Sequence, residues 1–357
     1  MGNHTPLFDA HLAANAKMVD FGGWDMPLNY GSQLEEHHAV RGGAGVFDVS
    51  HMTVIDVSGP DTQSFLRHCL ANDIARLDEV GGALYTVLLN TSAGIVDDLI
   101  VYRRAGDYRL VVNAGTREAV LANINAHAAA FDTSVVHRGD LAMLAVQGPT
   151  AVERFVALCG IEEIAELAPF RMLERDDWMV ARTGYTGEDG VELLLPDTEV
   201  AGVWTDLLAA GVAPAGLAAR DTLRLEAGLN LYGQDMDGET HPLEANLGWT
   251  IAWQPDSRDF VGRDALGAIR EAGSEWKLTG VVLEGRGVMR HGYRVVTEAG
   301  EGTVTSGIFS PTLGYSVALA RVPRAAAGAC EVEIRGRHLS ARLVRPPFVR
   351  NGVRVHK

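Results

Sequence analysis

Two adjacent carboxylates on a predicted strand are the side chains of this chain best suited to chemistry. Residues 96–102 have the pattern of a β-strand, and side chains two positions apart on a strand share a face. Asp98, Ile100 and Tyr102 therefore face one way, and Asp97 faces the other. A carboxylate beside an aliphatic and an aromatic side chain is typical of a binding-site wall. The alternative, which the pattern alone favours, is a pair at a strand start that faces water and backbone donors.

The turn after this strand fixes what lies opposite Asp98. If Ala105 and Gly106 form a two-residue turn, Arg104 pairs with Asp107 and, counting back, Asp98 lies opposite Asn113. A turn displaced by one residue would break this alignment. The prediction of an Asp98–Asn113 pair therefore depends on the turn.

A glycine-rich segment at 184–192 (GYTGEDGVE) predicts a hairpin loop between two strands. Tyr185 lies in the loop, and Glu192 places a carboxylate on an otherwise apolar strand, where it either binds a ligand or faces water. We interpret the three glycines as turn residues. No phosphate-loop lysine follows them, so a nucleotide site is not expected.

Two arginines four residues apart follow at Arg220 and Arg224, within the segment 216–228 (GLAARDTLRLEAG). This spacing puts both guanidinium groups on one helix face, where either could bind an anion. The alternative is a solvated ladder of ion pairs with Asp221 and Glu226.

The histidines and serines do not suggest metal or nucleophilic chemistry. His37, His38 and His51, with Asp48, have no HExxH or two-His-one-carboxylate spacing, and adjacent histidines rarely bind one metal. No Gly-x-Ser-x-Gly elbow occurs. We therefore expect no metal and no serine nucleophile.

Composition narrows the class of protein. A chain of 357 residues with 47% hydrophobic residues predicts two or three packed domains. A net charge of −15 argues against nucleic-acid binding. No apolar stretch is long enough to cross a bilayer, and no signal-peptide core is present, so no membrane association is expected. The three cysteines lack metal spacing and are interpreted as buried thiols of a cytoplasmic protein.

The elements that hold these side chains form an α+β pattern with antiparallel sheets. Strands are predicted at 52–57, 83–89, 95–102, 108–112, 142–147, 180–183 and 191–195, and helices at 32–41, 61–69, 116–129, 151–158, 200–209 and 219–229. Residues 21–28, with their glycines and proline, predict an irregular, tightly turned path. From residue 279 onward only short strands are expected, as in a small β-barrel or sandwich.

Several separated segments, in order, resemble signatures of the aminomethyltransferases, the T proteins of the glycine cleavage system. Besides the segments at 96–102, 184–192 and 216–228, they are FGGW at 21–24, FDVSHM at 47–52, LYGQDMD at 231–237, PLEANLGW at 242–249 and TSGIFSPTLG at 305–314. The chain departs from the family at Ala93 and Ala218, where glycine is usual. Neither departure removes a functional side chain.

The resemblance implies a three-domain ring, or cloverleaf. Two antiparallel-sheet α+β domains would comprise residues 1–50 with 140–265 and residues 51–139, and a C-terminal β-barrel domain would comprise 275–357. The implied reaction transfers a methylene from aminomethyl-dihydrolipoyl H protein to tetrahydrofolate and releases ammonia. Tetrahydrofolate is the acceptor substrate, the lipoylated H protein is the partner, and no metal or nucleotide is implied.

The resemblance also implies roles for individual residues. Asp98 is the catalytic residue that contacts the pterin nitrogens, Glu192 accepts hydrogen bonds from the pterin donor pair, and Arg220 binds the glutamate tail. The other implied folate-binding residues are Met52, Tyr85, Ile100, Tyr102, Asn113, Tyr185 and, as a weaker second candidate for the tail, Arg350. A demethylase of the same fold, the folate module of a methylglycine-oxidising protein and a non-catalytic folate-binding regulator stay open as alternatives.

Overall fold

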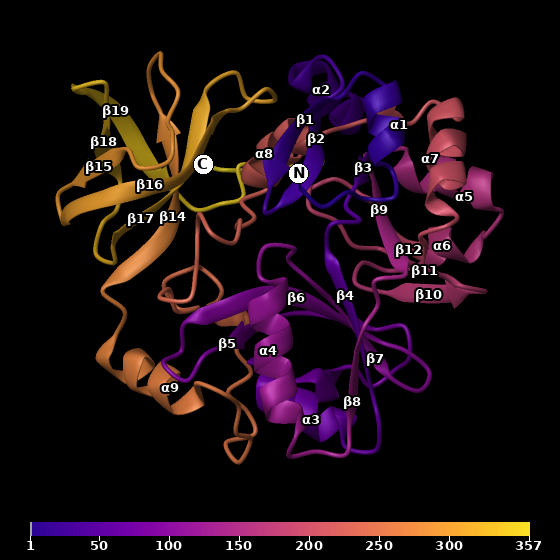
Figure 1. Cartoon of the computed structure of the whole chain (residues 1–357). Coiled ribbons are helices and arrows are strands. Elements are labelled where there is room, and N and C mark those ends of the chain that lie inside the picture. The colour runs from indigo at the N-terminus through magenta and orange to yellow at the C-terminus, as the bar shows by residue number, and fades with distance from the viewer. Residues whose placement is uncertain (1) are drawn as a thin grey trace.

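The computed structural model describes residues 2–357 as three groups of elements around a central region (Figure 1). A six-stranded sheet with its helices, a five-stranded sheet and a closed six-stranded barrel form these groups. The predicted combination of α+β units with a C-terminal barrel is therefore confirmed.

The six-stranded sheet has the order β10-β11-β12-β9-β3-β13 and is antiparallel except for the β3–β13 pair. Both of its faces are buried. Leu193 of β12 packs toward Trp204 of α7, whereas Leu194 packs with residues of the five-stranded sheet. Glu192 shares the face of Leu194 and so points toward that second sheet. The elements are β3 (Gly45–Asp48), β9 (Leu141–Gln147), β10 (Met172–Arg175), β11 (Trp178–Ala181), β12 (Gly190–Pro196), β13 (Ala213–Pro214), α5 (Ala151–Cys159), α6 (Glu163–Glu166) and α7 (Val200–Ala209).

The five-stranded sheet has the order β5-β6-β7-β4-β8. Helices α3 and α4 cover one face, where Leu99 and Val101 of β6 join the core, and Tyr102 lies on the opposite face. The predicted alternation along β6 is confirmed. The elements are β4 (Thr53–Ser58), α3 (Thr62–Cys69), the 3-10 turn η1 (Ile74–Arg76), β5 (Ala83–Leu89), β6 (Ile95–Arg103), β7 (Tyr108–Val112), α4 (Arg117–Ala128) and β8 (Ser134–His137).

The N-terminal segment packs against helix α8 (Leu217–Glu226), which lies between the barrel and the group with the six-stranded sheet (Figure 1). It comprises α1 (Phe8–Ala13), β1 (Lys17–Phe21), β2 (Trp24–Asn29) and α2 (Gln33–Gly42). The prediction of an irregular path at 21–28 is wrong. Gly22 and Gly23, at φ 59° and 84°, make a two-residue turn, and Phe21 pairs with Trp24 in a regular hairpin.

The barrel closes through β14 (Trp276–Leu283), β17 (Ser316–Pro323), β16 (Gly300–Phe309), β15 (Arg294–Thr297), β18 (Ala329–Ile334) and β19 (Arg337–Val344). Its interior holds aliphatic side chains such as Val281, Val304 and Val332. No helix follows α9 (Arg263–Ala272) in the described part of the chain, as the sequence predicts. The remaining elements are the 3-10 turn η2 (Gly248–Thr250) and the short pair β20 (Val349–Arg350) and β21 (Val353–Arg354).

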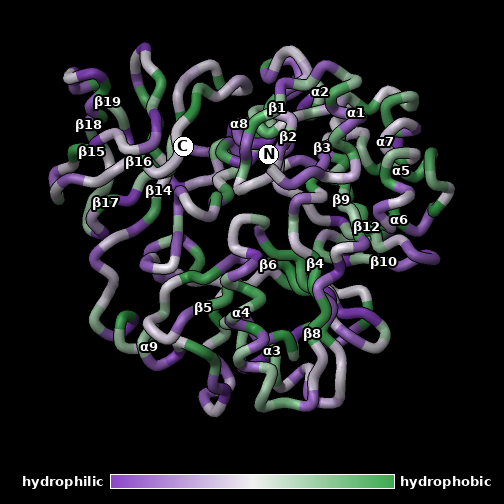
Figure 2. The backbone as a smooth tube through the Cα atoms, in the orientation of Figure 1, coloured by the Kyte–Doolittle hydropathy of each residue, from purple (hydrophilic) through white to green (hydrophobic). Residues whose placement is uncertain are grey.

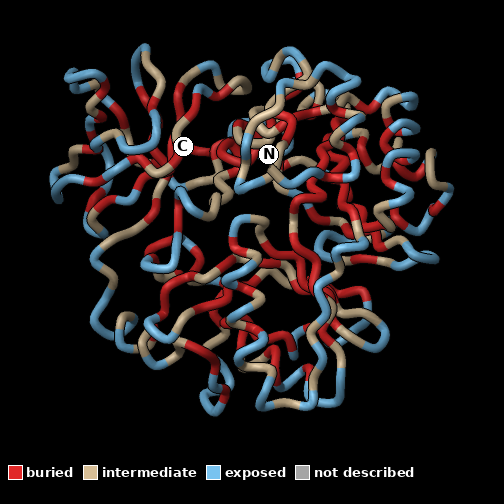
Figure 3. The backbone as a smooth tube through the Cα atoms, viewed as in Figure 1, coloured by how far each residue is buried: buried red, intermediate tan, exposed pale blue. Residues whose placement is uncertain are grey.

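Hydropathy and burial coincide in the strands that face the centre. Figure 2 shows hydrophobic residues along β4 and its neighbouring strands. Figure 3 shows that the same strands and α8 are largely buried. Within residues 2–357, no helix has the length and apolar character that crossing a membrane requires.

Helix α8 begins at a close approach between two backbones. Gly216, its N-cap, donates its N–H to Glu36 Oε2 at 2.9 Å. A Cβ at this position would lie 2.5 Å from the Leu28 carbonyl oxygen of β2. Glycine is therefore required where α8 meets the β1–β2 hairpin.

We predict that Gly216→Ala lowers the free energy of unfolding by about 1–3 kcal/mol, because backbone must move to admit the methyl group. Chemical denaturation measures the change. Gly202→Ala in α7 is the matched control: a Cβ there meets no atom within 4 Å, and the change should stabilise by about 0.5–1 kcal/mol. Wild-type stability of Gly216→Ala would contradict the close approach.

Candidate active site

Asp98 sits in a hydrogen-bonded group formed by three neighbouring strands. The Tyr85 hydroxyl of β5 donates to Asp98 Oδ2 at 2.7 Å, and Asn113 Nδ2, just after β7, donates to Asp98 Oδ1 at 2.9 Å. The Arg104 N–H donates to the Asp107 carbonyl at 2.9 Å, so the predicted two-residue turn and register are confirmed. Burial raises the pKa of Asp98, whereas these hydrogen bonds act in the opposite direction.

Asp97 belongs to the same group although its side chain starts from the other face of β6. It is fully buried, and Asn113 donates to it through the backbone N–H at 3.0 Å and through Nδ2 at 2.8 Å. Burial, and then the charge of Asp98, raise the pKa of Asp97 to about 7. The pair therefore retains one proton up to near neutral pH.

Glu192 faces this group from the other sheet. Its Oε2 accepts a hydrogen bond from Thr183 Oγ1 at 2.6 Å, and the same Thr183 oxygen lies 3.2 Å from the Tyr102 hydroxyl. Burial raises the pKa of Glu192, and the charge of Arg220 opposes this. No other residue within 2–357 donates a hydrogen bond to the Glu192 carboxylate, so it retains capacity to accept bonds.

Tyr185 and Arg220 form the third part of the site. The Arg220 guanidinium lies 4.8 Å from the centre of the Tyr185 ring and 5.9 Å from that of Phe47. Arg220 Nη1 is buried and has no hydrogen-bond partner in the described chain. Burial raises the pKa of Tyr185, the charge of Arg224 opposes this, and the charge of Asp98 adds to it.

A cavity of about 610 Å³ opens beside Tyr185 and Arg220. Its walls come from β1, α2, α8 and the barrel, and include Phe21, Leu34 and Phe309. Arg224 and Arg290 also line it. A volume of this size with apolar walls and a few cations suits a partly aromatic, anionic small molecule.

The structure joins most of the predicted residues in three local groups, and of all the predicted residues only Tyr185 and Arg220 line the cavity. Asp98, Tyr85 and Asn113 are joined by hydrogen bonds, Tyr102 and Glu192 share Thr183, and Tyr185 stacks on Arg220. The remaining three are Met52 and Ile100, which pack against the core cluster that contains Tyr102, and Arg350, which is exposed on β20 and does not line the cavity.

Of the alternative of a solvated ladder on α8, the structure shows the Arg224–Asp221 pair, in which the Asp221 side chain is 46% exposed, but the rest does not hold. Arg224 is 1% exposed and donates to Asp235 Oδ2 and to Asp221 Oδ1, each at 2.8 Å. Glu226 is also buried and pairs with Arg41 of α2. The pairs with Asp235 and Arg41 are internal because the barrel covers the end of α8.

The histidines and cysteines make no metal cluster in the part of the chain that the structure describes. His37 pairs with Glu226, and Asp48 accepts from His11 Nε2 at 2.9 Å. Cys69 and Cys330 are buried as predicted, but Cys159 is only half-buried at the end of α5. All three are free thiols.

Sequence reasoning missed two neighbours of Asp98. Asp97 was placed on the opposite face, yet Asn113 reaches both carboxylates, and the alignment of Asn113 with Asp98 is the signal that could have indicated this. Trp249 of η2 stacks on Tyr85, with ring centres 5.6 Å apart, and is 65% exposed. Its sequence position, far from β5, gave no signal.

Known proteins match this chain over almost its whole length. Residues 7–255 match the GCVT N-terminal domain family, and residues 277–350 match the glycine cleavage T-protein C-terminal barrel domain. An aminomethyltransferase of Pseudomonas syringae pv. tomato is 55% identical over 99% of each chain. One of Chromobacterium violaceum is 56% identical over 98% of each. The crystal structure of glycine cleavage system aminomethyltransferase T from Bartonella henselae has a TM-score of 0.93 at 37% identity, covering 98% of this chain and 99% of that one.

The ring of two α+β units and a barrel, with these matches, thus defines a one-carbon transferase of the T-protein class. The chain belongs to the glycine cleavage T-protein (GCVT) family. It is an enzyme, an aminomethyltransferase.

We predict that the Asp97–Asp98 pair makes stability fall as pH rises. The folded pKa of Asp97, about 7, exceeds its ordinary value of 3.8, so the folded state holds an extra proton between about pH 4 and pH 7. Asp97→Asn should flatten this slope by up to about 1.4 kcal/mol per pH unit, measured by denaturant unfolding at several pH values. An identical slope in wild type and variant would show that Asp97 is ionised throughout.

Proposed function

We propose that this enzyme transfers the methylene group of aminomethyl-dihydrolipoyl H protein to tetrahydrofolate, giving 5,10-methylenetetrahydrofolate, ammonia and the reduced lipoyl H protein. The observation that carries this proposal is the placement of two carboxylates, the partly buried Asp98 and the buried Glu192, on sheets that face each other. The ring would consist of residues up to 50 with 140–265, residues 51–139, and residues 275–357. We place the reaction in the cytoplasm.

A reduced pterin carries hydrogen-bond donors that the Glu192 carboxylate can still accept. The pterin ring carries a 2-amino group and an adjacent ring N–H, and a carboxylate accepts such a donor pair with both oxygens. Glu192 accepts one hydrogen bond from Thr183 and retains the capacity to accept more. Tyr102, Ile100 and Met52 offer the apolar wall along the ring.

Asp98 is suited to the reacting end of the pterin. The reaction requires a pterin nitrogen to attack a carbon that is bonded to both sulfur and nitrogen, and positive charge develops on nitrogen in that step. Tyr85 and Asn113 hold the Asp98 carboxylate in a fixed orientation. Asp98 stabilises the developing charge electrostatically or accepts a proton, and no covalent enzyme intermediate is required.

Arg220 is assigned to the glutamate tail of the folate. Its buried Nη1 has no partner in the described chain, and its side chain lines the cavity. A carboxylate from the ligand would satisfy that donor and offset the cost of the buried charge. Arg350, exposed on β20, is the weaker second candidate for the tail.

We predict that Asp98→Asn separates catalysis from binding. Turnover, measured as ammonia released from aminomethylated H protein with and without tetrahydrofolate, should fall by about 100-fold or more. Folate affinity should stay within about tenfold, or about 1.4 kcal/mol, because Asn preserves shape. Folate-independent release in wild type would argue against the proposed reaction, and near-normal turnover of the variant would remove Asp98 from it.

We predict that Arg220→Ala lowers the affinity for folates that carry a glutamate tail. It should hardly change the affinity for a tetrahydropterin that lacks the tail. The guanidinium lines the cavity, and loss of a charge-assisted contact costs about 1.5–3 kcal/mol. Calorimetry with both ligands measures the difference. Equal losses for the two would mean that Arg220 acts through Tyr185 and Phe47 instead.

A further inference from the structure

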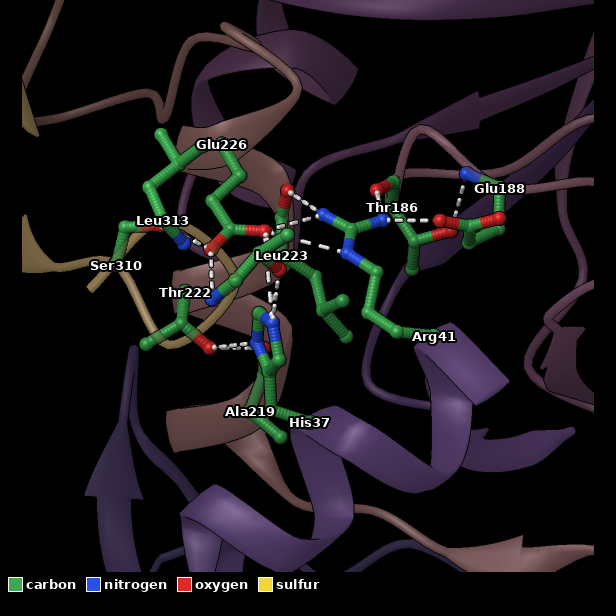
Figure 4. A network of polar contacts seen from close by, with 11 residues as sticks. His37, Arg41, Thr186, Glu188, Ala219, Thr222, Leu223, Glu226, Ser310 and Leu313 are labelled. Carbon is green, nitrogen blue, oxygen red and sulfur yellow. Dashed lines mark hydrogen bonds and ion pairs between the residues drawn. The ribbon is translucent and has the colours of Figure 1, made fainter. Parts of the chain in front are cut away.

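Arg41, near the end of α2, bridges two segments that are far apart in sequence (Figure 4). Its Nη2 donates to Glu226 Oε2 at 2.7 Å, and its Nε donates to the same oxygen at 3.2 Å. Its Nη1 donates to the Thr186 carbonyl at 2.8 Å and to Glu188 Oε1 at 2.7 Å. All of these groups are almost completely buried. The guanidinium thus joins the end of α8 to the glycine-rich loop.

The Glu226 carboxylate also holds the barrel. Its Oε1 accepts from Ser310 Oγ and from the Thr312 N–H at 3.1 Å, and its Oε2 accepts from Thr312 Oγ1 at 2.7 Å. Ser310 and Thr312 flank Pro311, which lines the cavity. The Arg41–Glu226 pair therefore connects α2, α8, the loop at 184–190 and the barrel loop at 310–313.

Arg41 is the permanent cation of this cluster. His37 contacts Thr222 Oγ1 at 2.8 Å and Thr312 Oγ1 at 3.0 Å, with Glu226 at 3.4 Å. Burial lowers the pKa of His37 despite Glu226, which favours a neutral imidazole at neutral pH. Burial by itself would raise the pKa of Glu226, but the contacts with His37 and Arg41 outweigh this effect and lower the pKa to about 2. Two buried carboxylates, Glu226 and Glu188, thus share one guanidinium.

The loop that Arg41 holds carries Tyr185. Thr186, whose carbonyl accepts from Arg41, also donates its hydroxyl to Gln147 Oε1 at 3.0 Å. Tyr185, one residue earlier, donates its hydroxyl to the Asn230 carbonyl and places its ring over Arg220. A shift of the Thr186 carbonyl would move the ring that packs on Arg220 at the cavity wall.

We propose that Arg41 is a positioning residue for folate binding: its fork to Glu226 and to the Thr186–Glu188 turn sets the place of Tyr185 against Arg220. This inference rests on the proposed function, in which these two side chains contact the folate. Arg41 does not itself line the cavity and acts only through the loop.

The test compares Arg41→Lys with wild type by calorimetric binding of tetrahydrofolate. Lysine keeps the charge but has one ammonium group, which cannot make the four contacts of the guanidinium with Glu226, Thr186 and Glu188. The dissociation constant should rise about tenfold or more. The same substitution at Arg175, an exposed partner of Glu163 at 2.8 Å, is the matched control and should change affinity by less than about twofold.

A double-mutant cycle with Tyr185→Ala separates positioning from general destabilisation. If Arg41 acts through Tyr185, adding Arg41→Lys to Tyr185→Ala should change folate affinity by less than about twofold. Glu188→Gln, which leaves Glu226 paired, should show a smaller loss that also disappears in the Tyr185→Ala background. This second variant carries the test if Arg41→Lys does not fold.

Two outcomes would overturn the inference. One is wild-type folate affinity in Arg41→Lys, and the other is an equal loss with and without the Tyr185 ring. Failure of wild type itself to bind tetrahydrofolate would instead contradict the proposed function. The two failures are therefore distinguished in the same experiment.

Discussion

Burial of charge along helix α8 is the constraint on which the rest of the arrangement depends. Arg224 and Glu226 are fully buried, and Arg220 has a buried guanidinium nitrogen. An uncompensated buried charge costs several kcal/mol, so each needs a partner supplied by another part of the chain. Arg224 donates hydrogen bonds to Asp235 and Ser306. Glu226 accepts hydrogen bonds from Arg41 and from the barrel loop. Because these partners come from different units, the helix determines how the units sit around it.

The same constraint explains why a binding site lies at the centre. The buried Glu192 and the partly buried Asp98 have no direct cation partner, and desolvation raises the pKa of both. Arg220 is a buried cation without a hydrogen-bonded anion in the described chain. The donors of a pterin and the carboxylates of a glutamate tail complement these groups. A ligand of this kind would therefore satisfy charges that the protein alone leaves incompletely compensated.

Local features of the site could be predicted from sequence, and features that depend on packing between units could not. The strand alternation at Asp98 and its alignment with Asn113 followed from period two and a two-residue turn. The regular hairpin at Phe21 was missed because two adjacent glycines were interpreted as a break in structure. The buried pairing of Arg224 was not visible, because only the covering barrel removes that helix face from water.

The geometry of the structure supports some of the residue roles, and others rest on resemblance to the family. Geometry independently groups Asp98, Asn113 and Tyr85, and it adds Asp97, which strand alternation had placed apart. The assignment of Arg220 to the tail still rests on resemblance, supported by its free donor and its place at the cavity. Arg41 emerges only from three-dimensional contacts between segments that are distant in sequence.

The central claim is that the facing carboxylates Asp98 and Glu192 bind opposite parts of one reduced pterin. A crystal structure of the enzyme with tetrahydrofolate tests it most directly. The account predicts the 2-amino group and adjacent N–H within hydrogen-bond distance of Glu192, the reacting nitrogens beside Asp98, and the tail leading past Arg220. A pterin bound elsewhere, or one that contacts neither carboxylate, would contradict the account.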